Sequence, residues 1–260
     1  ILQEAIAGKL TADWRAAHPD VEPASELLHR IQAEKSRLIA AKKLRPEKPL
    51  PKITAAEIPF EIPKGWEWCR LGALCTKVTD GFHNTPPKVA EGFPYIAATH
   101  VKSDGIDFAN AYLVEEKFHR ELYAKTEPQR GEILVVNIGA GSGCPAIIDV
   151  DFEFSFKNTA ILKFNQELLS NIYLFNYLRH IQPENYATLT RGANQPFLSL
   201  KVIKEFVIPL PPLAEQAAIV ARVEALMEHC RALAAEIAHT RTHAAHLLQA
   251  VLKEAFAPAS

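Results

Sequence analysis

The sequence lacks the features that would mark a membrane protein, a secreted protein or a strongly basic nucleic-acid binder. No apolar run approaches the ~20 residues that a membrane-spanning helix needs, and no signal-peptide pattern is present. Lys and Arg total 29 against 30 Asp and Glu, so any nucleic-acid contact must come from a local basic patch. We expect a soluble, cytoplasmic protein with no membrane partner, whose 48% hydrophobic content suffices for a packed core.

The sequence also lacks a catalytic constellation, a nucleotide-binding motif and a convincing metal motif. The glycine-rich residues 138–143 have no Lys of the phosphate-binding loop, so they indicate a tight turn between strands. His239, His243 and His246 follow helical spacing, where a zinc site is conceivable, but the polar face of a helix explains them more simply. We therefore expect no catalytic residues, no metal, no cofactor and no enzymatic activity of the chain alone.

The four cysteines contain no C-x-x-C pair, which favours reduced, structural residues over a redox or metal centre. The chain begins at Ile1 and its only methionine, Met227, lies far downstream. We therefore expect it to be a fragment of a longer protein.

The two ends of the chain carry nearly the same seven residues. Residues 1–7 read ILQEAIA and residues 251–257 read VLKEAFA, with Leu, Glu and both Ala in the same places. Solenoid repeats recur every roughly 20 to 50 residues, far less than this separation. The repeat therefore predicts a whole domain flanked by two ends of the same kind of helix.

A heptad pattern runs through the C-terminal residues 218–257. Apolar or small residues recur at alternating steps of four and three, a period typical of a coiled coil. The seam residues are Ile219, Val223, Leu226, Cys230, Leu233, Ile237, Thr240, Ala244, Leu247 and Val251. The prolines of residues 209–212 mark the start of the helix. Small seam residues such as Cys230 favour a close antiparallel partner; the alternative is a helix laid across its own domain.

The N-terminal residues predict a shorter helical region followed by a basic linker. A first helix ends near Gly8, residues 13–23 form an irregular connection, and a second helix starts at Ala24. Residues 42–52 combine Lys and Arg with three prolines. Such a segment is either a solvated hinge, which its composition favours, or a strap that contacts phosphates.

Between residues 62 and 212 the pattern changes to short β-like runs broken by Gly and Pro. These runs cover residues 95–101, 132–138, 145–150 and 159–164, and one helix is expected at residues 171–180. The fold class is therefore α+β, a mixed globular domain flanked by helical regions. We expect three parts: a proximal helical region with its linker (1–61), a globular domain (62–212) and a distal coiled-coil helix (213–260).

Four segments in this order resemble the specificity subunit of type I restriction-modification enzymes, and the resemblance covers the whole chain. They are ILQ (1–3) with GKL (8–10), EPASELL (22–28), IPKGWEW (62–68) with RLG (70–72), and IPLPPLAEQ (208–216) with Ile219 and Val220. The resemblance implies two target-recognition domains held apart by an antiparallel helical pair that acts as a spacer. It also implies docking of methyltransferase subunits and, through them, of the restriction subunit.

In that arrangement the chain corresponds to one half: a helix end, one recognition domain and one long helix. Its expected partners are double-stranded DNA, the methyltransferase subunits, and a second copy or second half of the specificity subunit. A stiff helix pair suits this task, because two halves of a split site must lie on the correct face of the duplex.

Candidate DNA contacts are the residues whose chemistry suits bases or phosphates: Asn, Gln and Arg for base edges, Lys and Arg for phosphates. They are Lys77, Thr79, His83, Asn84, Thr85, Lys88, Asn137, Lys157, Arg191, Asn194 and Gln195. Residues 80–86 resemble the family's Asp-Gly-x-His-x-Thr-Pro stretch, and residues 192–195 its Gly-Ser-x-Gln loop, with Ala193 in place of Ser. For both loops the alternative is a turn tied together by local hydrogen bonds.

The leading hypothesis is a non-catalytic DNA-recognition subunit, or half of one. The competing hypothesis is a coiled-coil interaction scaffold whose central domain does not bind DNA, which the near-neutral net charge favours. An enzyme is a distant third.

Overall fold

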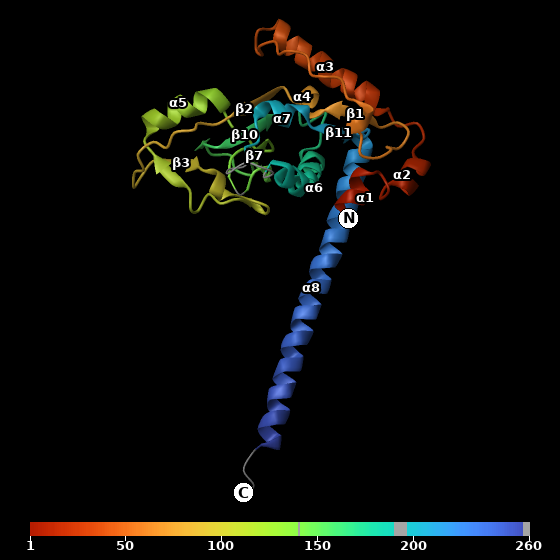
Figure 1. Cartoon of the computed structure of the whole chain (residues 1–260), viewed down its shortest axis with the longest axis vertical. Helices are drawn as coiled ribbons and strands as arrows, with labels where there is room; N and C mark the ends of the chain where they lie inside the picture. The colour runs from red at the N-terminus through yellow and green to blue at the C-terminus, as the bar shows by residue number, and fades with distance from the viewer. Residues whose placement is uncertain (140, 190–196, 257–260) are drawn as a thin grey trace.

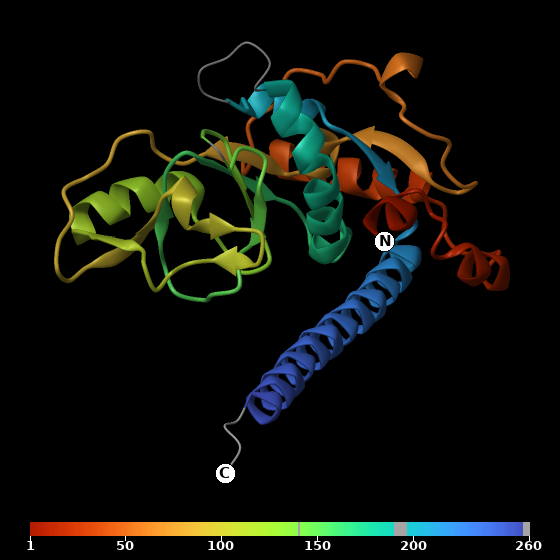
Figure 2. The same ribbon diagram turned by 60° about the horizontal axis from the view of Figure 1, so that its bottom comes forward.

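One long helix, α8 (Leu213–Ala255), projects away from the rest of the protein, which forms a head at its base (Figures 1 and 2). This computed structural model describes residues 1–139, 141–189 and 197–256. The predicted start of the helix is confirmed, because α8 begins directly after Pro211 and Pro212. The helix does not fold back over its own head (Figure 1).

The N-terminal region contains three helices, α1 (Leu2–Ile6), α2 (Ala12–Ala17) and α3 (Ala24–Ala40). Gly8 follows α1 with φ +69°, and a Cβ at this position would lie 2.5 Å from Cγ of Pro63, so glycine is needed for both reasons. The prediction of an irregular connection over residues 13–23 was wrong in its first part, because α2 lies there. Helix α3 is confirmed and buries Ala24, Leu27 and Ile31.

Two sheets form most of the head. The four-stranded antiparallel sheet has the order β2-β10-β7-β8, and the three-stranded sheet has the order β6-β3-β9, in which β3 and β9 run parallel. Their strands are β2 (Lys77–Asp80), β10 (Thr159–Lys163), β7 (Ile133–Val136), β8 (Pro145–Ile147), β6 (Tyr112–Val114), β3 (Phe93–Ile96) and β9 (Ser155–Phe156).

Strand β7 lies at the centre of the core. All four of its residues are buried, and because successive side chains point to opposite faces, Ile133 and Val135 enter one hydrophobic cluster while Leu134 and Val136 enter another. Strands β7, β8 and β10 lie within three of the apolar runs seen in the sequence. The fourth run splits into β3 and β4.

Two short two-stranded pairs and several helices complete the head. They are β1 (Glu67–Arg70) with β11 (Val207–Leu210), β4 (Val101–Lys102) with β5 (Gly105–Ile106), and the helices η1 (Ala55–Glu57), α4 (Leu71–Leu74), η2 (Ala98–His100), α5 (Glu116–Thr126), α6 (Asn171–Leu189) and α7 (Leu200–Glu205). The expectation of one helix within this domain was wrong, since α4, α5 and α7 accompany α6. The β1–β11 pair brings the start and the end of the head together at the base of α8, which begins at Leu213, shortly after β11.

The base of α8 is packed into the head, and the rest of the helix is not. Ile219 and Val223 are buried in a cluster with Ala5, Trp66 and Tyr173. Gln216 is buried as well; its Oε1 accepts from the amide of Ser170 at 2.9 Å. These contacts fix the direction in which α8 leaves the head.

Candidate nucleic-acid interface

Several of the candidate recognition residues lie where three adjacent strands of the main sheet meet their loops. At the end of β2, Phe82 pairs with Lys157 in an isolated bridge, and the amide of Asn158 donates to the carbonyl of Phe82 at 3.1 Å. The carbonyl of Asn158 in turn accepts from the amide of Asn137, which follows β7, at 3.0 Å. Three loops that are distant in sequence therefore lie side by side.

Phe197 and Leu198 lie in the same neighbourhood. Ile138 pairs with Phe197, and the amide of Leu198 donates to the carbonyl of Asn137 at 2.7 Å. The predicted residues Arg191, Asn194 and Gln195 lie outside the described residues.

The loop of residues 80–88 is held by several side-chain contacts. Asp80 accepts from Lys125 of α5 at 3.0 Å and lies 3.2 Å from Nε2 of His83. The hydroxyl of Tyr95 donates to the carbonyl of Asn84 at 2.8 Å. Burial opposes ionisation of Asp80, but the hydrogen bond and charge of Lys125 outweigh it, so the pKa of this carboxyl is lowered. Asp80 is therefore held by α5, outside the loop, as well as by its contact with His83 within the loop.

The outer part of the same loop still presents exposed polar side chains. His83, Asn84, Thr85 and Lys88 are exposed. Lys157 donates to the hydroxyl of Thr85, and Nζ of Lys88 lies 3.4 Å from the ring centre of Tyr112. The loop is therefore held in place by its contacts and still exposes polar side chains to solvent.

Gly81 explains why this loop can lie so close to β9. A Cβ at Gly81 would come within 2.3 Å of the carbonyl oxygen of Phe156, so any other residue would push the two segments apart. Asn158, which has φ +56°, makes the turn between β9 and β10. Asparagine is one of the few residues that adopt this conformation readily.

Three predicted residues do not lie on the exposed edge. Asn137 is 2% exposed, and its Oδ1 has no hydrogen-bond partner among the described residues, so it cannot reach a duplex directly. Lys77 lies at the far end of β2, half-buried, and donates to the carbonyl of Lys125 at 2.6 Å. Burial lowers its pKa, followed by the charge of Lys163. Thr79 is half-buried within β2.

Sequence reasoning missed Lys125, which holds Asp80. The helix that carries it, α5, was not expected, and an isolated Lys gives no signal of its own. The contact of Lys88 with Tyr112 was also missed, because the two residues are brought together only by the fold.

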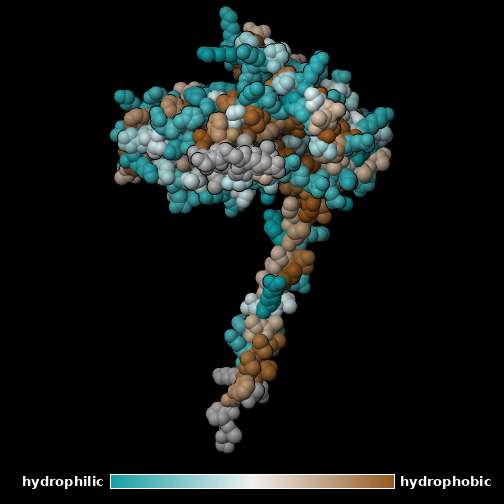
Figure 3. All heavy atoms as spheres, in the orientation of Figure 1, coloured by the Kyte–Doolittle hydropathy of each residue, from teal (hydrophilic) through white to brown (hydrophobic). Residues whose placement is uncertain are grey.

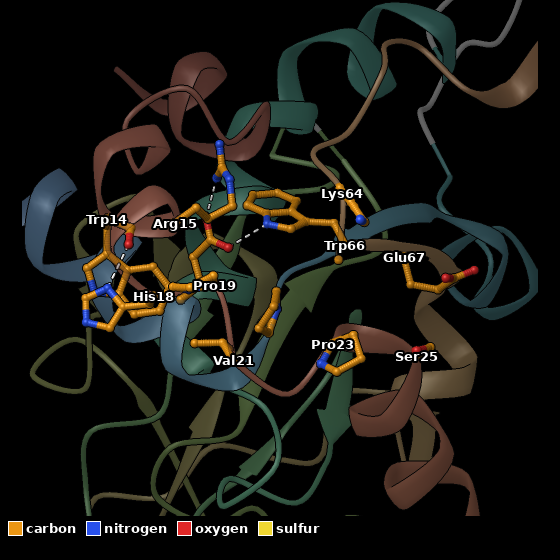
Figure 4. A pocket seen from close by; sticks show the side chains of 13 residues that line it. Trp14, Arg15, His18, Pro19, Val21, Pro23, Ser25, Lys64, Trp66 and Glu67 are labelled. Atoms are coloured by element: carbon orange, nitrogen blue, oxygen red, sulfur yellow. Dashed lines mark hydrogen bonds and ion pairs between the residues drawn. The ribbon is translucent and has the colours of Figure 1, made fainter.

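A second feature lies at the base of α8, where Glu215 is completely buried. Its carboxylate accepts from Thr11 at 2.7 Å and from Nε1 of Trp66 at 2.8 Å. It also forms an ion pair with Arg15, and Figure 4 draws the contacts made by Arg15 and Trp66. A cavity of about 700 Å³ opens beside this network and is lined by aromatic, proline and charged residues, including Trp14 and His18, whose rings stack. The network joins the N-terminal helices, the head and α8.

The predicted seam of α8 changes from buried to exposed along its length. Ile219 and Val223 are buried and Leu226 is half-buried, whereas Cys230 is exposed. Leu233, Ile237, Leu247 and Val251 are exposed too, Leu233 to 59% and Val251 to 60%. Figure 3 shows apolar surface along the projecting helix. The part of α8 beyond the head therefore presents an apolar stripe that no described residue covers.

Three further features concern membrane-spanning helices, metal-binding groups and the cysteines. Within residues 1–139, 141–189 and 197–256 no helix is long and apolar enough to cross a membrane. In the same ranges, no group of His, Cys, Asp and Glu side chains is arranged to hold a metal. All four cysteines are free, and burial raises the pKa of Cys75 to about 12.

A head that gathers polar loops at one edge and carries an uncovered apolar helix has the form of a recognition module on a helical arm. The family model of the type I restriction modification DNA specificity domain matches residues 63–239, more than half of the chain. The chain belongs to this family, and the resemblance seen in the sequence is confirmed.

Two relatives from Escherichia coli are similar over almost the whole chain. The specificity subunit of the type I restriction enzyme EcoAI is 29% identical over 265 residues, and that of EcoEI is 28% identical over 263 residues. Each alignment covers 96% of this chain and 43% of the relative, so the chain spans less than half of their length. Both are named specificity subunits, which agrees with the expectation of a non-catalytic role.

Solved structures support the fold. The HsdS subunit from Thermoanaerobacter tengcongensis has a TM-score of 0.55 at 21% identity and covers 98% of this chain and 58% of its own. A chain from a structure of a type I R-M system has a TM-score of 0.57 at 22% identity, with the same coverage. The α+β fold with a long C-terminal helix is thus shared with these structures.

Proposed function

We propose that the chain is one DNA-reading half of a type I specificity subunit, in which residues 62–212 read one half of a bipartite target. The observation that carries this proposal is the convergence of the 80–88 loop, the 157–158 turn and the flank of the 190–196 segment at one edge of the head. His83, Asn84, Thr85, Lys88 and Lys157 are the candidates for contacts in the described part of this edge.

The helices supply the spacer in this proposal. Residues 213–260 pair antiparallel with a second copy or a second half, through the apolar stripe that α8 leaves uncovered beyond Val223. Such a pair holds two recognition heads at a fixed separation. Residues 1–61 and the helix pair together dock the methyltransferase subunits and, through them, the restriction subunit.

A domain exchange tests the proposal in the assembled methyltransferase. Residues 62–207 are replaced by the corresponding residues of a relative with a different target, and the methylated sequence is then mapped in DNA. We expect one half of the bipartite target to change and the other half and the spacer to remain. An unchanged target would contradict the proposal.

The uncovered stripe of α8 also favours a second candidate, a scaffold that binds protein and not DNA. Salt dependence separates the two, because each neutralised phosphate contributes a slope of about 0.9 to the fall of log K with log salt. Binding to duplex DNA that weakens steeply with salt supports the recognition module. No measurable DNA binding supports the scaffold.

A further inference from the structure

The basic linker is not a hinge but a strap, residues 42–57, that is fixed along the head. The composition-based preference for a hinge was wrong, and one residue, Arg70, accounts for much of the difference. The guanidinium of Arg70 is buried and donates to the carbonyls of Pro51 and Lys52 at 3.2 and 3.1 Å and to both carboxylate oxygens of Glu57 at 2.7 and 3.1 Å. It also donates to the carbonyl of Glu205 at 2.6 Å.

A second attachment lies at the middle of the strap. Glu47 pairs with Lys204 of α7 at 2.7 Å and with Lys35 of α3 at 3.4 Å. Leu50 packs against Gly72, where a Cβ would lie 3.1 Å from Cδ1 of Leu50. Glu47 and Leu50 are therefore held against different elements of the head.

These attachments use the acidic side chains of the strap and leave its basic ones free. Glu47 and Glu57 are its two acidic residues, and both are paired with cations of the helices and the head. The basic residues are exposed and form no ion pair with any described residue; they are Lys42, Lys43, Arg45, Lys48 and Lys52. The outer surface of the strap is consequently positive in a chain whose net charge is −1.

The backbone at the start of the strap adopts a defined turn. Lys42 adopts φ +57°, and its amide donates to the carbonyl of Ile39 at 2.9 Å, which ends α3 and turns the chain onto the head. Glycine or asparagine is the usual residue at such a position. A lysine at this position costs conformational free energy, because a residue with a Cβ rarely adopts a positive φ, and it adds a positive charge to the strap.

The strap is connected to the recognition loops by way of α7. It lies beside α7, because Glu47 pairs with Lys204, and the exposed residues Lys48 and Lys201 line the same pocket. α7 follows Leu198, whose amide binds the carbonyl of Asn137, and Asn137 binds the turn next to Lys157. Contacts through the interior of the head therefore connect the strap to the 80–88 loop, since Leu198 and Asn137 on this route are buried.

We propose that the strap is a second DNA-contacting surface, which binds the phosphate backbone of the duplex beside the half-site read by the loops. The proposal rests on the proposed function and assigns phosphate contacts to residues outside the recognition domain. An ordered row of Lys and Arg suits phosphates, because little conformational freedom is lost on binding. A protein partner fits less well, since none of the exposed large apolar side chains among the described residues belongs to residues 42–57.

The test uses the full chain and a short fluorescent duplex of mixed sequence, with anisotropy measured over a series of salt concentrations. The triple variant K43Q/R45Q/K48Q removes three charges, and the control K9Q/K64Q/K117Q removes three exposed lysines elsewhere. We expect the slope of log K against log salt to fall by about 2.7 in the strap variant, at about 0.9 per contact, and to be unchanged in the control. The strap variant should also bind at least about tenfold more weakly at low salt.

A second variant, R70Q, keeps every charge of the strap but removes its main attachment, and we expect weaker binding from it as well. Should R70Q fail to fold, the triple surface variant still decides the question. The strap proposal alone would be overturned if the strap variant bound DNA with the same affinity and salt slope as the wild type. It would also be overturned if the control variant lost as much affinity and slope as the strap variant. If the wild type shows no salt-dependent binding to any duplex, the proposed function falls together with the strap.

Discussion

The indole of Trp66 donates from Nε1 to Oε2 of Glu215 at 2.8 Å, at a point where the carboxylate is completely buried. Trp66 precedes the first strand of the head, and Glu215 lies in the first turn of α8. The other oxygen of Glu215 binds Thr11 and Arg15 of the N-terminal region. One carboxylate therefore connects three segments that are widely separated in sequence.

We predict that E215A destabilises the protein by about 3 kcal/mol, because removing one partner of a buried ion pair leaves the other without compensation. W66F removes a single N–H donor from the same carboxylate and should cost about 1–3 kcal/mol. The free energy of unfolding in urea measures both. E228Q, at an exposed position of α8, is the control and should be neutral. A neutral E215A would show that the network does not support the base of the helix.

A pH dependence is expected from His119, which is buried on α5 between Ser155 and Glu153. Nδ1 lies 2.9 Å from Oγ of Ser155, and Nε2 lies 3.3 Å from Oε2 of Glu153. Burial lowers the pKa of His119 and outweighs the opposing effect of Glu153, while the charge of Arg120 lowers it further. The stability that neutral His119 contributes is therefore complete above its unfolded pKa, near ~6.5, and is lost as the pH falls through that value towards the folded pKa.

We predict that wild-type stability declines between about pH 7 and pH 5 more steeply than that of H119Q, which cannot titrate. Urea unfolding at several pH values gives the comparison. H29Q alters an exposed histidine of α3 and should keep the wild-type profile. Parallel profiles for wild type and H119Q would contradict the assignment.

In the recognition loop we expect one residue, Lys88, to contact a phosphate and another, Asn84, to contact a base. K88Q should lower the salt slope by about 0.9 without changing sequence preference, because phosphates carry no sequence information. N84A should leave the slope unchanged and weaken discrimination at one base pair by about 1–3 kcal/mol. Anisotropy across salt tests the first, and methylation mapping in the assembled enzyme tests the second. If K88Q changed the sequence preference and N84A changed the salt slope, the two assigned roles would be exchanged.

The sequence predicted the elements whose apolar pattern is strong. α3, α8 and the buried strands β7, β8 and β10 repeat apolar residues with a clear period or in a clear run. α5 was missed because its buried face includes His119 and Thr126, which a hydrophobic pattern does not count. β1 and β11 are short, and β11 contains Pro209, which is tolerated in a strand of a two-stranded pair but argues against a strand in sequence.

The sequence predicted individual residues of the candidate site, but it did not predict which of them the fold brings together. Polar residues around the Asp80–Gly81 turn suggested a loop for recognition, yet only the pairing of β2, β10 and β7 brings that loop to Lys157. The same pairing buries Asn137, whose side-chain chemistry alone suggested contact with DNA. The linker differs from its predicted role as a hinge for a related reason. Its composition is that of a hinge, but Arg70, whose N–H groups hold it in place, comes from another part of the chain.

The last prediction concerns the apolar stripe of α8 beyond the head. L233E/L247E places two charges on the stripe, and burying an unpaired carboxylate in a helix interface costs several kcal/mol, so pairing should be lost. Glu is a good helix former, so α8 itself and the unfolding of the head should not change. A235E/Q249E introduces the same charges outside the seam and is the matched control. Sedimentation should show the control in the wild-type assembly and the stripe variant as a monomer, whereas an unchanged mass for L233E/L247E would mean that the chain does not pair through this face.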